Sequence, residues 1–316
     1  MNIFWMDRDG SEPPENGSFG YCPFSQNSPL LCESVTRIRN LPPPTKPIRV
    51  MRRTFLPTRE EWSLNMEKTR EQKTFDKVVL ARCCVFECET APDPFAVTAR
   101  LLTQAQNSTV FCYANEQMAF LGATPELLFS KVGRELQSEA VAGTCKRGKT
   151  TKEDKTLEEA LLVNQKAVSE IAPVAAFLQD RLSLLCSPLV FSPLHVRKTP
   201  NVQHLCMQVE GRLHQETPDA KILQQIHPTP ALCGSPTKNA RDWIAKIEPF
   251  ERGLYGGALG WSTPEKSVWV VAIRCCLIQN TTVKLYTGAG IVAKSNPQEE
   301  WEELDHKMEL YKDIFV

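Results

Sequence analysis

The distribution of apolar and polar positions along the chain predicts strands that alternate with short helices. Runs rich in β-branched and aromatic residues recur between turn-forming residues, which is typical of strands, and apolar residues at helical spacing separate several of them. Short turns join many neighbouring strands, which favours antiparallel pairing, so the pattern predicts an α+β fold with large antiparallel sheets. The expected strands are 75–86, 110–115, 118–121, 127–131, 135–142, 189–197, 202–211, 253–261, 268–277 and 282–287, and the expected helices are 58–73, 94–103, 152–183, 221–226, 240–248 and one after Pro297. Thr58 is the expected N-cap of the first of these helices, and Glu61 completes a capping box.

The long apolar run from Phe75 to Phe86 carries two cations. Lys77 and Arg82 are five residues apart, so they lie on opposite faces of a strand. A charged side chain in such a run either reaches water along its aliphatic stem or has a function. The strand pattern alone leaves this choice open.

The longest helical pattern, residues 152–183, contains a carboxylate on an apolar stripe. Glu170 shares this stripe with apolar residues such as Val163. Because burial of an unpaired carboxylate is unfavourable, we expect Glu170 to contact either Lys166, one turn earlier, or a metal ion. Pro173 should kink or divide the helix because proline lacks an N–H donor.

The last thirty or so residues combine glycines with charged side chains. A strand is predicted to run into a turn at Gly288 and Gly290, where bare N–H groups can approach an anion. In the helix that follows, Glu300, Glu303 and Lys307 share one face. Two carboxylates and one ammonium group beside such a turn suit a divalent metal and a carboxylate substrate. Ordinary charges on a solvated helix end are the alternative.

The N-terminal segment differs in composition from the rest of the chain. Residues 1–48 are rich in proline, serine, glycine and asparagine. A strand is predicted near Ile3, and the remainder predicts loops or a poorly ordered arm. We therefore divide the chain into an N-terminal arm or partial, truncated sheet, 1–48, and a main domain, 49–316. Within the main domain, the proline-rich loop 227–234 can hold a polar residue in one place.

Composition and charge argue against several kinds of partner. Lysine plus arginine and aspartate plus glutamate both number 37, so no net positive charge favours nucleic acid or an anionic membrane surface. The N-terminus lacks the pattern of a secretory signal, and the apolar run 268–278, interrupted by Arg274, is too short to cross a bilayer. The twelve cysteines form no C-x-x-C pair, and buried free thiols in a reducing cytoplasm are the simplest interpretation.

Seven stretches of the sequence together resemble the chorismate-utilising enzymes, a family of isochorismate synthases, salicylate synthases and the large subunits of anthranilate and aminodeoxychorismate synthases. They occur in the family's order and cover the chain from about residue 60 to its end. The resemblance implies large antiparallel sheets packed as a sandwich with helices on the outside, and it makes 49–316 a chorismate-binding catalytic domain. The stretches are 77–82, 121–128, 142–148, the helix around Lys166 and Glu170, 227–231, 271–274 and 288–307.

The resemblance implies the activity of an isochorismate synthase. Members that add water are similar to this chain in having lysine at the position of Lys77, whereas ammonia-using members usually have glutamine. Lys77 would be the general base that activates water for attack on C2 of chorismate, and Glu126 would be the general acid that protonates the departing C4 hydroxyl. A lysine base needs a lowered pKa and a glutamate acid a raised one. The isomerisation needs no redox cofactor.

The resemblance also implies a metal ion and a substrate pocket. Glu170 and Glu303 would hold Mg²⁺ against the ring carboxylate, with Glu300 as a further ligand or as a support for the other two. The enolpyruvyl carboxylate would be bound by Arg274, Lys307 and the N–H groups of Gly288 and Gly290. The remaining substrate contacts would be Gly143, Thr144, His204, His227, Ala231 and Ile273. For the two histidines, an ordinary structural role is an equal alternative.

Departures from the family pattern keep alternatives open. Ala167 and Ile171 follow Lys166 and Glu170 where the family usually has aspartate and histidine, Pro173 lies in the same helix, and the N-terminus is shorter than in most relatives. One alternative is a salicylate synthase, which shares the lysine base, and another is a non-catalytic relative that binds chorismate. We expect a cytoplasmic monomer. Whether its product would serve menaquinone, siderophore or salicylate synthesis is not indicated.

Overall fold

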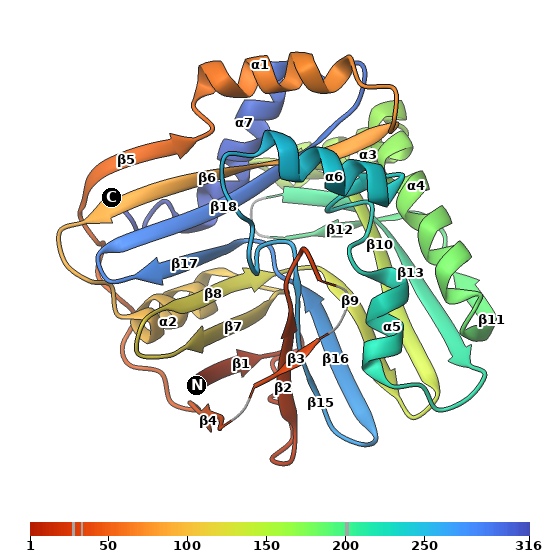
Figure 1. Cartoon of the computed structure of the whole chain (residues 1–316), viewed down its shortest axis with the longest axis horizontal. Helices are drawn as coiled ribbons and strands as arrows, with labels where there is room; N and C mark the ends of the chain where they lie inside the picture. Colours follow the sequence, from red (N-terminus) through yellow and green to blue (C-terminus); the bar gives the residue numbers. More distant parts are fainter. Residues whose placement is uncertain (27–28, 33, 200–201) are drawn as a thin grey trace.

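The computed structural model describes residues 1–26, 29–32, 34–199 and 202–316, and its strands form two large sheets, A and B (Figure 1). The strands of sheet A are β1 (Asn2–Met6), β4 (Thr36–Arg37), β5 (Val50–Leu56), β6 (Lys77–Cys88), β7 (Thr109–Ala114), β8 (Ala119–Thr124), β14 (Gly234–Ser235), β17 (Cys275–Gln279) and β18 (Thr282–Ile291). The strands of sheet B are β2 (Ser18–Cys22), β3 (Leu30–Leu31), β9 (Leu127–Val132), β10 (Glu135–Lys146), β11 (Cys186–Phe191), β12 (His195–Lys198), β13 (Val202–Leu213), β15 (Ala258–Ser262) and β16 (Lys266–Val271). The helices are α1 (Arg59–Arg70), α2 (Pro94–Gln104), α3 (Thr151–Leu162), α4 (Gln165–Leu182), α5 (Asp219–Ile226), α6 (Thr237–Ile247), α7 (Pro297–Met308) and the 3-10 turn η1 (Glu309–Tyr311).

Strand pairing is almost entirely antiparallel. Sheet A has the order β14-β6-β18-β17-β8-β7-β1-β4, with β5 also paired to β6. Sheet B has the order β11-β13-β10-β9-β16-β15-β2-β3, with β12 also paired to β13. Between the named strands of the described residues, the pairing of β1 with β4 alone is parallel. The predicted α+β fold with large antiparallel sheets is therefore confirmed.

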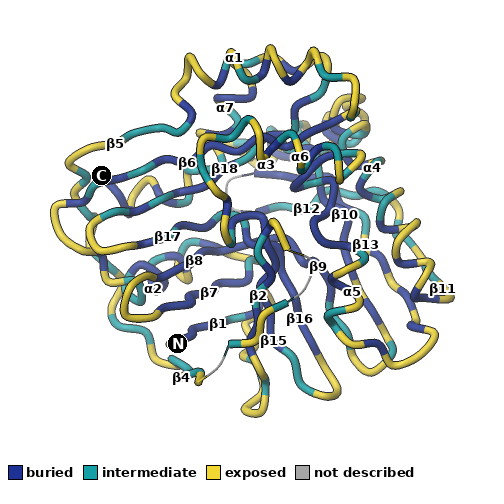
Figure 2. The backbone as a smooth tube through the Cα atoms, in the orientation of Figure 1, coloured by how far each residue is buried: buried dark blue, intermediate teal, exposed yellow. Residues whose placement is uncertain are grey.

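The two sheets pack face to face, and helices cover their outer faces (Figure 1, Figure 2). The side chains of β6 alternate between these layers: Ala81 and Cys83 belong to the core between the sheets, whereas Val78 and Leu80 pack with α1, α6 and α7. Helices α4 and α5 cover sheet B, and α2 covers sheet A. The predicted sandwich with external helices is confirmed.

Helix α1 begins at the predicted cap and supports α7. Thr58 Oγ1 accepts a hydrogen bond from the Glu61 N–H (3.2 Å), and Glu61 Oε2 accepts one from the Thr58 N–H (2.9 Å), which forms a capping box. The buried Trp62 of α1 packs edge-on against Trp301 of α7, with ring centroids 6.1 Å apart. Helix α1 therefore supports the helix that carries Glu303 and Lys307.

The predicted strand 268–277 is wrong as a single element. The chain leaves sheet B at Val271, the end of β16, and joins sheet A at Cys275, the start of β17. It turns at Arg274, whose φ of +51° is unusual for a residue other than glycine. The Arg274 carbonyl accepts hydrogen bonds from the Ala123 N–H (3.1 Å) and the Tyr311 hydroxyl (2.8 Å), which hold this turn. Arg274 consequently lies where the chain crosses from one sheet to the other.

The predicted helix 152–183 is two helices, α3 and α4, bent by 61° at a break between them. The break falls at Val163 and Asn164, and Pro173 lies inside α4 without ending it. Asn164 caps α4, because its side-chain oxygen accepts a hydrogen bond from the Ala167 N–H (2.9 Å). Val163 is 78% exposed, so its expected place on the apolar stripe was wrong. Within the described residues no single helix is long and apolar enough to cross a membrane, and α3 with α4 reaches that length and composition only as a bent pair.

Three other segments differ from their predicted form. The expected strand 189–197 is divided into β11 and β12 around Pro193. In 253–261 the strand starts only at Ala258, because turns with positive φ at Gly253 and Gly256 precede it. The expected turn at residues 288–290 is instead part of β18, where it pairs with β6 in a regular register.

The first 48 residues contribute strands to both sheets. Strand β1 pairs with β7 in sheet A, and β2 pairs with β15 in sheet B. The strand expected near Ile3 is thus present, whereas the boundary at residue 48 stays a prediction. All twelve cysteines are free thiols, and all except Cys32 and Cys145 are buried.

Candidate active site

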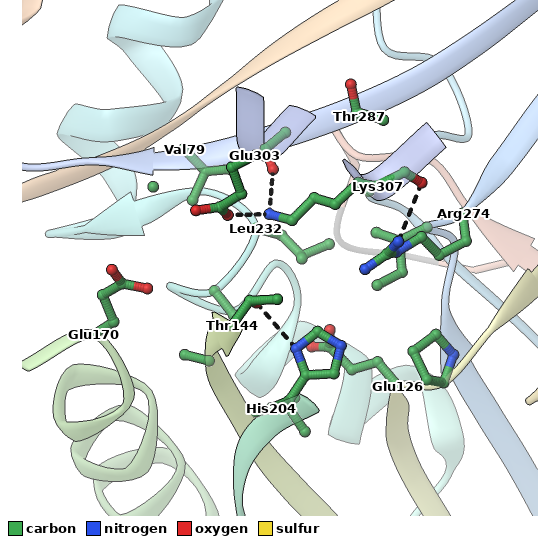
Figure 3. A pocket seen from close by; sticks show the side chains of 18 of the residues that line it. Val79, Glu126, Thr144, Glu170, His204, Leu232, Arg274, Thr287, Glu303 and Lys307 are labelled. Atoms are coloured by element: carbon green, nitrogen blue, oxygen red, sulfur yellow. Dashed lines mark hydrogen bonds and ion pairs between the residues drawn. The ribbon is translucent and has the colours of Figure 1, made fainter. Parts of the chain in front are cut away.

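A cavity lies where the two sheets meet beside α4 and α7 (Figure 3). Strands β6 and β18 of sheet A and β10 and β13 of sheet B contribute to its wall. The expected site residues all line it except His227 and Glu300. The lining residues are Lys77, Val79, Pro125, Glu126, Val141, Ala142, Gly143, Thr144, Glu170, His204, Ala231, Leu232, Arg252, Tyr255, Gly256, Ile273, Arg274, Tyr286, Thr287, Gly288, Gly290, Glu303 and Lys307.

Lys77 is the first residue of β6 and is only 5% exposed. A Cβ atom added at Gly290 would lie 2.7 Å from Lys77 Cε, so the missing side chain of that glycine provides the space for the lysine. Burial lowers the pKa of the Lys77 ammonium, and the negative charge of Glu170 acts in the opposite direction. The site therefore favours the neutral amine more than water does.

Glu126 lies between β8 and β9 and is 6% exposed. Burial, reinforced by the negative charge of Glu139, raises the pKa of the Glu126 carboxyl to about 7, although Arg197 acts in the opposite direction. Its backbone N–H donates to Thr124 Oγ1 (3.2 Å). The carboxyl is therefore substantially protonated at neutral pH, as a general acid requires.

Two cations of the cavity are linked through α7 and β18 (Figure 3). The Arg274 guanidinium donates to the Lys307 carbonyl (3.1 Å), and Lys307 Nζ donates to Glu303 Oε1 (2.6 Å) and to the Gly288 carbonyl (2.7 Å). The pairing of β17 with β18 ends at Tyr286, so the β18 edge beyond it is open to these side chains. The N–H of a strand residue points to the same edge as its C=O, which leaves the Gly288 N–H on the Lys307 side.

Two carboxylates, Glu170 from α4 and Glu303 from α7, face the same cavity (Figure 3). Burial raises the pKa of Glu170; Lys77 opposes this shift and Glu303 reinforces it. Among the described residues, Glu170 has neither a hydrogen bond nor an ion pair of its own. Glu303 is partly neutralised by Lys307 and has a lowered pKa.

This donor set is compatible with Mg²⁺. In the part of the chain that is described, no three acidic, histidine or cysteine side chains gather closely enough to enclose a metal by themselves. Mg²⁺ usually keeps several waters and takes only one or two protein carboxylates together with substrate oxygens. The unpartnered Glu170 beside Glu303 fits that mode of binding, and a cation between them would relieve their mutual repulsion.

Glu300 and Lys166 pair with each other outside the cavity lining. Glu300 is 1% exposed but does not line the cavity, and its Oε1 pairs with Lys166 Nζ (3.1 Å). Lys166 is therefore the partner of Glu300, whereas the sequence offered it as one of two partners for Glu170. The hypothesis that Glu300 contacts the metal directly has no support from this geometry.

Thr144 and His204 form a polar pair on the wall that sheet B provides (Figure 3). Gly143, with φ +68°, makes a bulge in β10 next to Ala167, where a Cβ would approach the Ala167 Cβ to 2.8 Å. Thr144 Oγ1 then lies 3.0 Å from His204 Nδ1. Burial holds the pKa of His204 well below its usual range, so the ring is neutral. Its buried Nε2 has no partner among the described residues and is available to a ligand.

His227 does not line the cavity, which corrects its expected place. The side chain is buried, and its Nε2 lies 3.3 Å from the Pro23 carbonyl. The contact joins loop 227–234 to the N-terminal segment. The position of His227 therefore agrees with the structural role that the sequence left open as the alternative to substrate contact.

The cavity also contains residues that the sequence patterns did not single out. Tyr255 stacks on Tyr286, with ring centroids 5.2 Å apart, and its hydroxyl would be 2.6 Å from a Cβ at Gly288. Thr287 has a buried hydroxyl without a partner among the described residues. Tyr286 and Thr287 directly precede the glycines of β18, so strand alternation could have drawn attention to them. No pattern in the neighbouring sequence identifies Tyr255, because it reaches β18 only through the tertiary fold.

Three comparisons with known proteins give a consistent result. The family model described as chorismate binding enzyme matches residues 31–314. Isochorismate synthase 2 of Arabidopsis thaliana, a chloroplastic protein, is 39% identical over 74% of this chain, and isochorismate synthase MenF of Bacillus subtilis is 33% identical over 79% of it. The solved structure of MenF, the menaquinone-specific isochorismate synthase from Escherichia coli, superposes with a TM-score of 0.88 at 25% identity and covers 99% of this chain and 88% of that one.

The matched region covers only part of the length of each of these two relatives. The matched region spans 42% of the Arabidopsis protein and 54% of the Bacillus protein. These alignments therefore include the part of each relative that corresponds to most of this chain and leave the rest of the relative unmatched.

Proposed function

Since the chain belongs to the family of chorismate-binding enzymes, we propose that it is an isochorismate synthase, which isomerises chorismate to isochorismate. The matched isochorismate synthases support this choice within the family. One observation carries the proposal: a buried lysine with a lowered pKa and a buried glutamate with a raised pKa line the same cavity. These are the proton affinities that a base and an acid need to work together near neutral pH.

In the proposed reaction, Lys77 Nζ accepts a proton from water as the water oxygen bonds to C2 of chorismate. The ring double bond shifts, the C4–O bond breaks, and Glu126 donates its proton to the departing hydroxyl, which leaves as water. One water enters and one leaves, so no redox partner is required. Each cycle leaves a protonated lysine and an ionised glutamate, which exchange protons with solvent before the next turnover.

The substrate carboxylates would be held by cations on one side of the cavity. We assign the enolpyruvyl carboxylate to Arg274, Lys307 and the N–H of Gly288, because these groups converge on the open edge of β18. His204 and Thr144 would contact the opposite end of the substrate from sheet B, and Ala231 and Ile273 would complete its apolar surface.

We include Mg²⁺ in this proposal, held by Glu170 and Glu303. When bound, it would neutralise the ring carboxylate and fix its orientation, which is positioning and electrostatic chemistry. Glu300 and its partner Lys166 would then support α7 behind the site. A cytoplasmic location, which the many free thiols favour, belongs to the same proposal.

The deciding experiment is incubation of the purified protein with chorismate and Mg²⁺, with chromatographic separation of the products. We expect isochorismate from the wild type, and a Lys77→Gln variant that is slower by roughly 10²–10⁴-fold because the base is lost. Lys73→Gln, an exposed lysine four residues earlier, is the matched control and should keep full activity.

Other outcomes would assign the protein differently. Salicylate with pyruvate would identify a salicylate synthase, and aminated products in the presence of ammonia would show that Lys77 is not a water-activating base. Unchanged chorismate with folded protein and Mg²⁺ present would favour a non-catalytic chorismate-binding protein.

A further inference from the structure

A cluster of charges around the buried Glu139 lies next to Glu126, outside the cavity lining. Glu139 of β10 is 5% exposed and accepts hydrogen bonds from two arginines. Its Oε1 lies 2.7 Å from Arg8 NH1, and its Oε2 lies 2.7 Å from Arg197 NH1. A carboxylate this deeply buried requires such partners, since desolvation of an unpaired charge is costly. The cluster joins β10, β12 and the turn that follows β1.

Arg197 connects this cluster to the segment that carries Glu126. Besides Glu139, its NH1 donates to the Pro125 carbonyl (3.1 Å), and its NH2 lies 2.9 Å from Cys206 Sγ. Pro125 directly precedes Glu126 in the two-residue link between β8 and β9. Because proline has no N–H, its carbonyl is the one backbone hydrogen-bonding group that Pro125 offers.

We propose that Arg197, held in place by its ion pair with Glu139, is a positioning residue that fixes the Pro125–Glu126 link and thereby orients the Glu126 carboxyl toward the substrate. This inference rests on the proposed function of Glu126 as the general acid. Arg197 holds the link on one side at the Pro125 carbonyl. On the other side, the Glu126 carbonyl accepts a hydrogen bond from the Val271 N–H (3.1 Å). With both flanking peptides fixed, the side chain has little freedom except its own rotamers.

The same pair also acts on the proton of Glu126. The charged groups that face Glu126 are Glu139 from β10, Arg197 from β12, Lys307 from α7 and Lys77 from β6. Glu139 raises the pKa of Glu126, and the three cations lower it. Glu139 and Arg197 therefore oppose each other, so removal of either one should shift the Glu126 pKa in a direction that identifies which charge was lost.

The N-terminal segment contributes to this arrangement through Arg8. Arg8, in the turn after β1, is partly exposed and contacts Glu139. Because Arg8 also neutralises Glu139, Arg197 can pair with Glu139 and still donate a hydrogen bond to the Pro125 carbonyl. The N-terminal segment thus contacts the residue that supports the proposed acid, although none of its described residues lines the cavity.

The test compares Glu139→Gln, Arg197→Met and Arg197→Lys in the full-length protein. The Glu126 pKa is measured by NMR of ¹³C-labelled glutamate carboxyls, assigned with Glu126→Gln, and compared with the alkaline limb of the kcat–pH profile. We expect Glu139→Gln to lower and Arg197→Met to raise this pKa, each by on the order of one pH unit. Arg197→Lys keeps the charge, so its pKa should stay near the wild-type value while kcat falls and KM changes little.

The matched control is the exposed pair Glu135 and Arg212 on neighbouring strands β10 and β13, whose charged atoms lie 3.0 Å apart. Glu135→Gln and Arg212→Met should leave both readouts unchanged. Shifts in the same direction for Glu139→Gln and Arg197→Met, or none, would overturn the proposal, as would full kcat in Arg197→Lys. A wild type that does not convert chorismate would refute the proposed function, while the NMR titration would still test whether this pair governs Glu126.

Discussion

At the scale of single residues, burial shifts the proton affinities of Lys77 and Glu126 in opposite directions. Desolvation disfavours a charged form, so it lowers the pKa of a lysine and raises that of a glutamate. Burial is the largest cause of both pKa shifts in this cavity. Burial in one cavity therefore shifts the pKa of each group in the direction that the proposed base and the proposed acid need. The neighbouring charges of Glu170 and Glu139 then adjust the balance.

The position of Lys77 depends on the absence of a side chain at Gly290. In Gly290→Ala the new methyl group would fall 2.7 Å from Lys77 Cε and would push the flexible end of the lysine aside. We expect kcat to fall by roughly 10–100-fold, because small displacements of a reacting group are costly. Steady-state kinetics with chorismate measure this effect.

The fold of the Gly290→Ala variant should remain nearly intact, since the nearest atoms belong to the movable end of a long side chain. Its melting temperature serves as the control. Wild-type kcat in a folded variant would show that the amine is not confined by Gly290.

At the scale of elements, α7 is the helix whose orientation matters most, because it carries both Glu303 and Lys307. A fully buried arginine of β6 anchors it: Arg82 NH2 lies 2.7 Å from Asp305 Oδ1, and the guanidinium packs 4.3 Å from the Trp301 ring centroid. Lys77 and Arg82 lie on opposite faces of β6, as the sequence predicts. One face of this strand therefore serves the cavity, and the other holds the helix that closes it.

Asp305→Asn should weaken this anchor. The variant leaves the buried Arg82 guanidinium without its anionic partner, and two of its nitrogens already lack partners among the described residues. We expect a loss of roughly 1 kcal/mol in the free energy of unfolding, because the asparagine oxygen can still accept a hydrogen bond from Arg82 but no longer carries the compensating charge. Denaturant titration measures the loss.

Asp313→Asn is the matched control for Asp305→Asn, because Asp313 is exposed shortly after α7. Its free energy of unfolding should stay within about 0.5 kcal/mol of the wild type. Equal stability of the two variants would contradict the anchoring role of the ion pair.

At the scale of the whole molecule, the N-terminal segment is tied to distant parts of the chain. Besides the Arg8–Glu139 pair, the Pro23 carbonyl lies 3.3 Å from His227 Nε2. Burial lowers the pKa of His227 to about 4. The folded protein therefore resists protonation of this ring, while the unfolded chain accepts a proton near its ordinary pKa of about 6.5.

This difference makes His227 a source of acid sensitivity. Its contribution to stability is complete above pH 6.5 and is lost as the pH falls toward 4, because only the unfolded state gains the proton in that window. The shift corresponds to a loss of about 3 kcal/mol between these limits. In His227→Gln the free energy of unfolding should fall less over this pH range, as measured by denaturant titrations.

Comparison of slopes isolates this residue, because other groups titrate equally in both proteins. His306→Gln, at an exposed histidine of α7, is the control and should retain the wild-type pH dependence. An unchanged slope in His227→Gln would show that the buried ring does not govern the acid response.

Features that depend on neighbouring residues could be predicted from the sequence alone. Periodicity identified most strands and helices, and the Thr58–Glu61 capping box marked the start of α1, because such signals act within one turn or one strand. Alternation placed Lys77 and Arg82 on opposite faces of β6. The seven motifs in family order identified the family, and the family resemblance identified most of the residues that line the cavity.

Features that depend on long-range partners became visible in the three-dimensional fold. The apolar run 268–277 has no local mark of the crossing at Arg274, where the strand partner changes from one sheet to the other. Gly288 and Gly290 stay within β18 because β6 continues beside them. Lys166 pairs with Glu300 of α7 and His227 with the Pro23 carbonyl, partners more than a hundred residues away. A local pattern specifies which face of an element is polar, but packing selects the group that meets it.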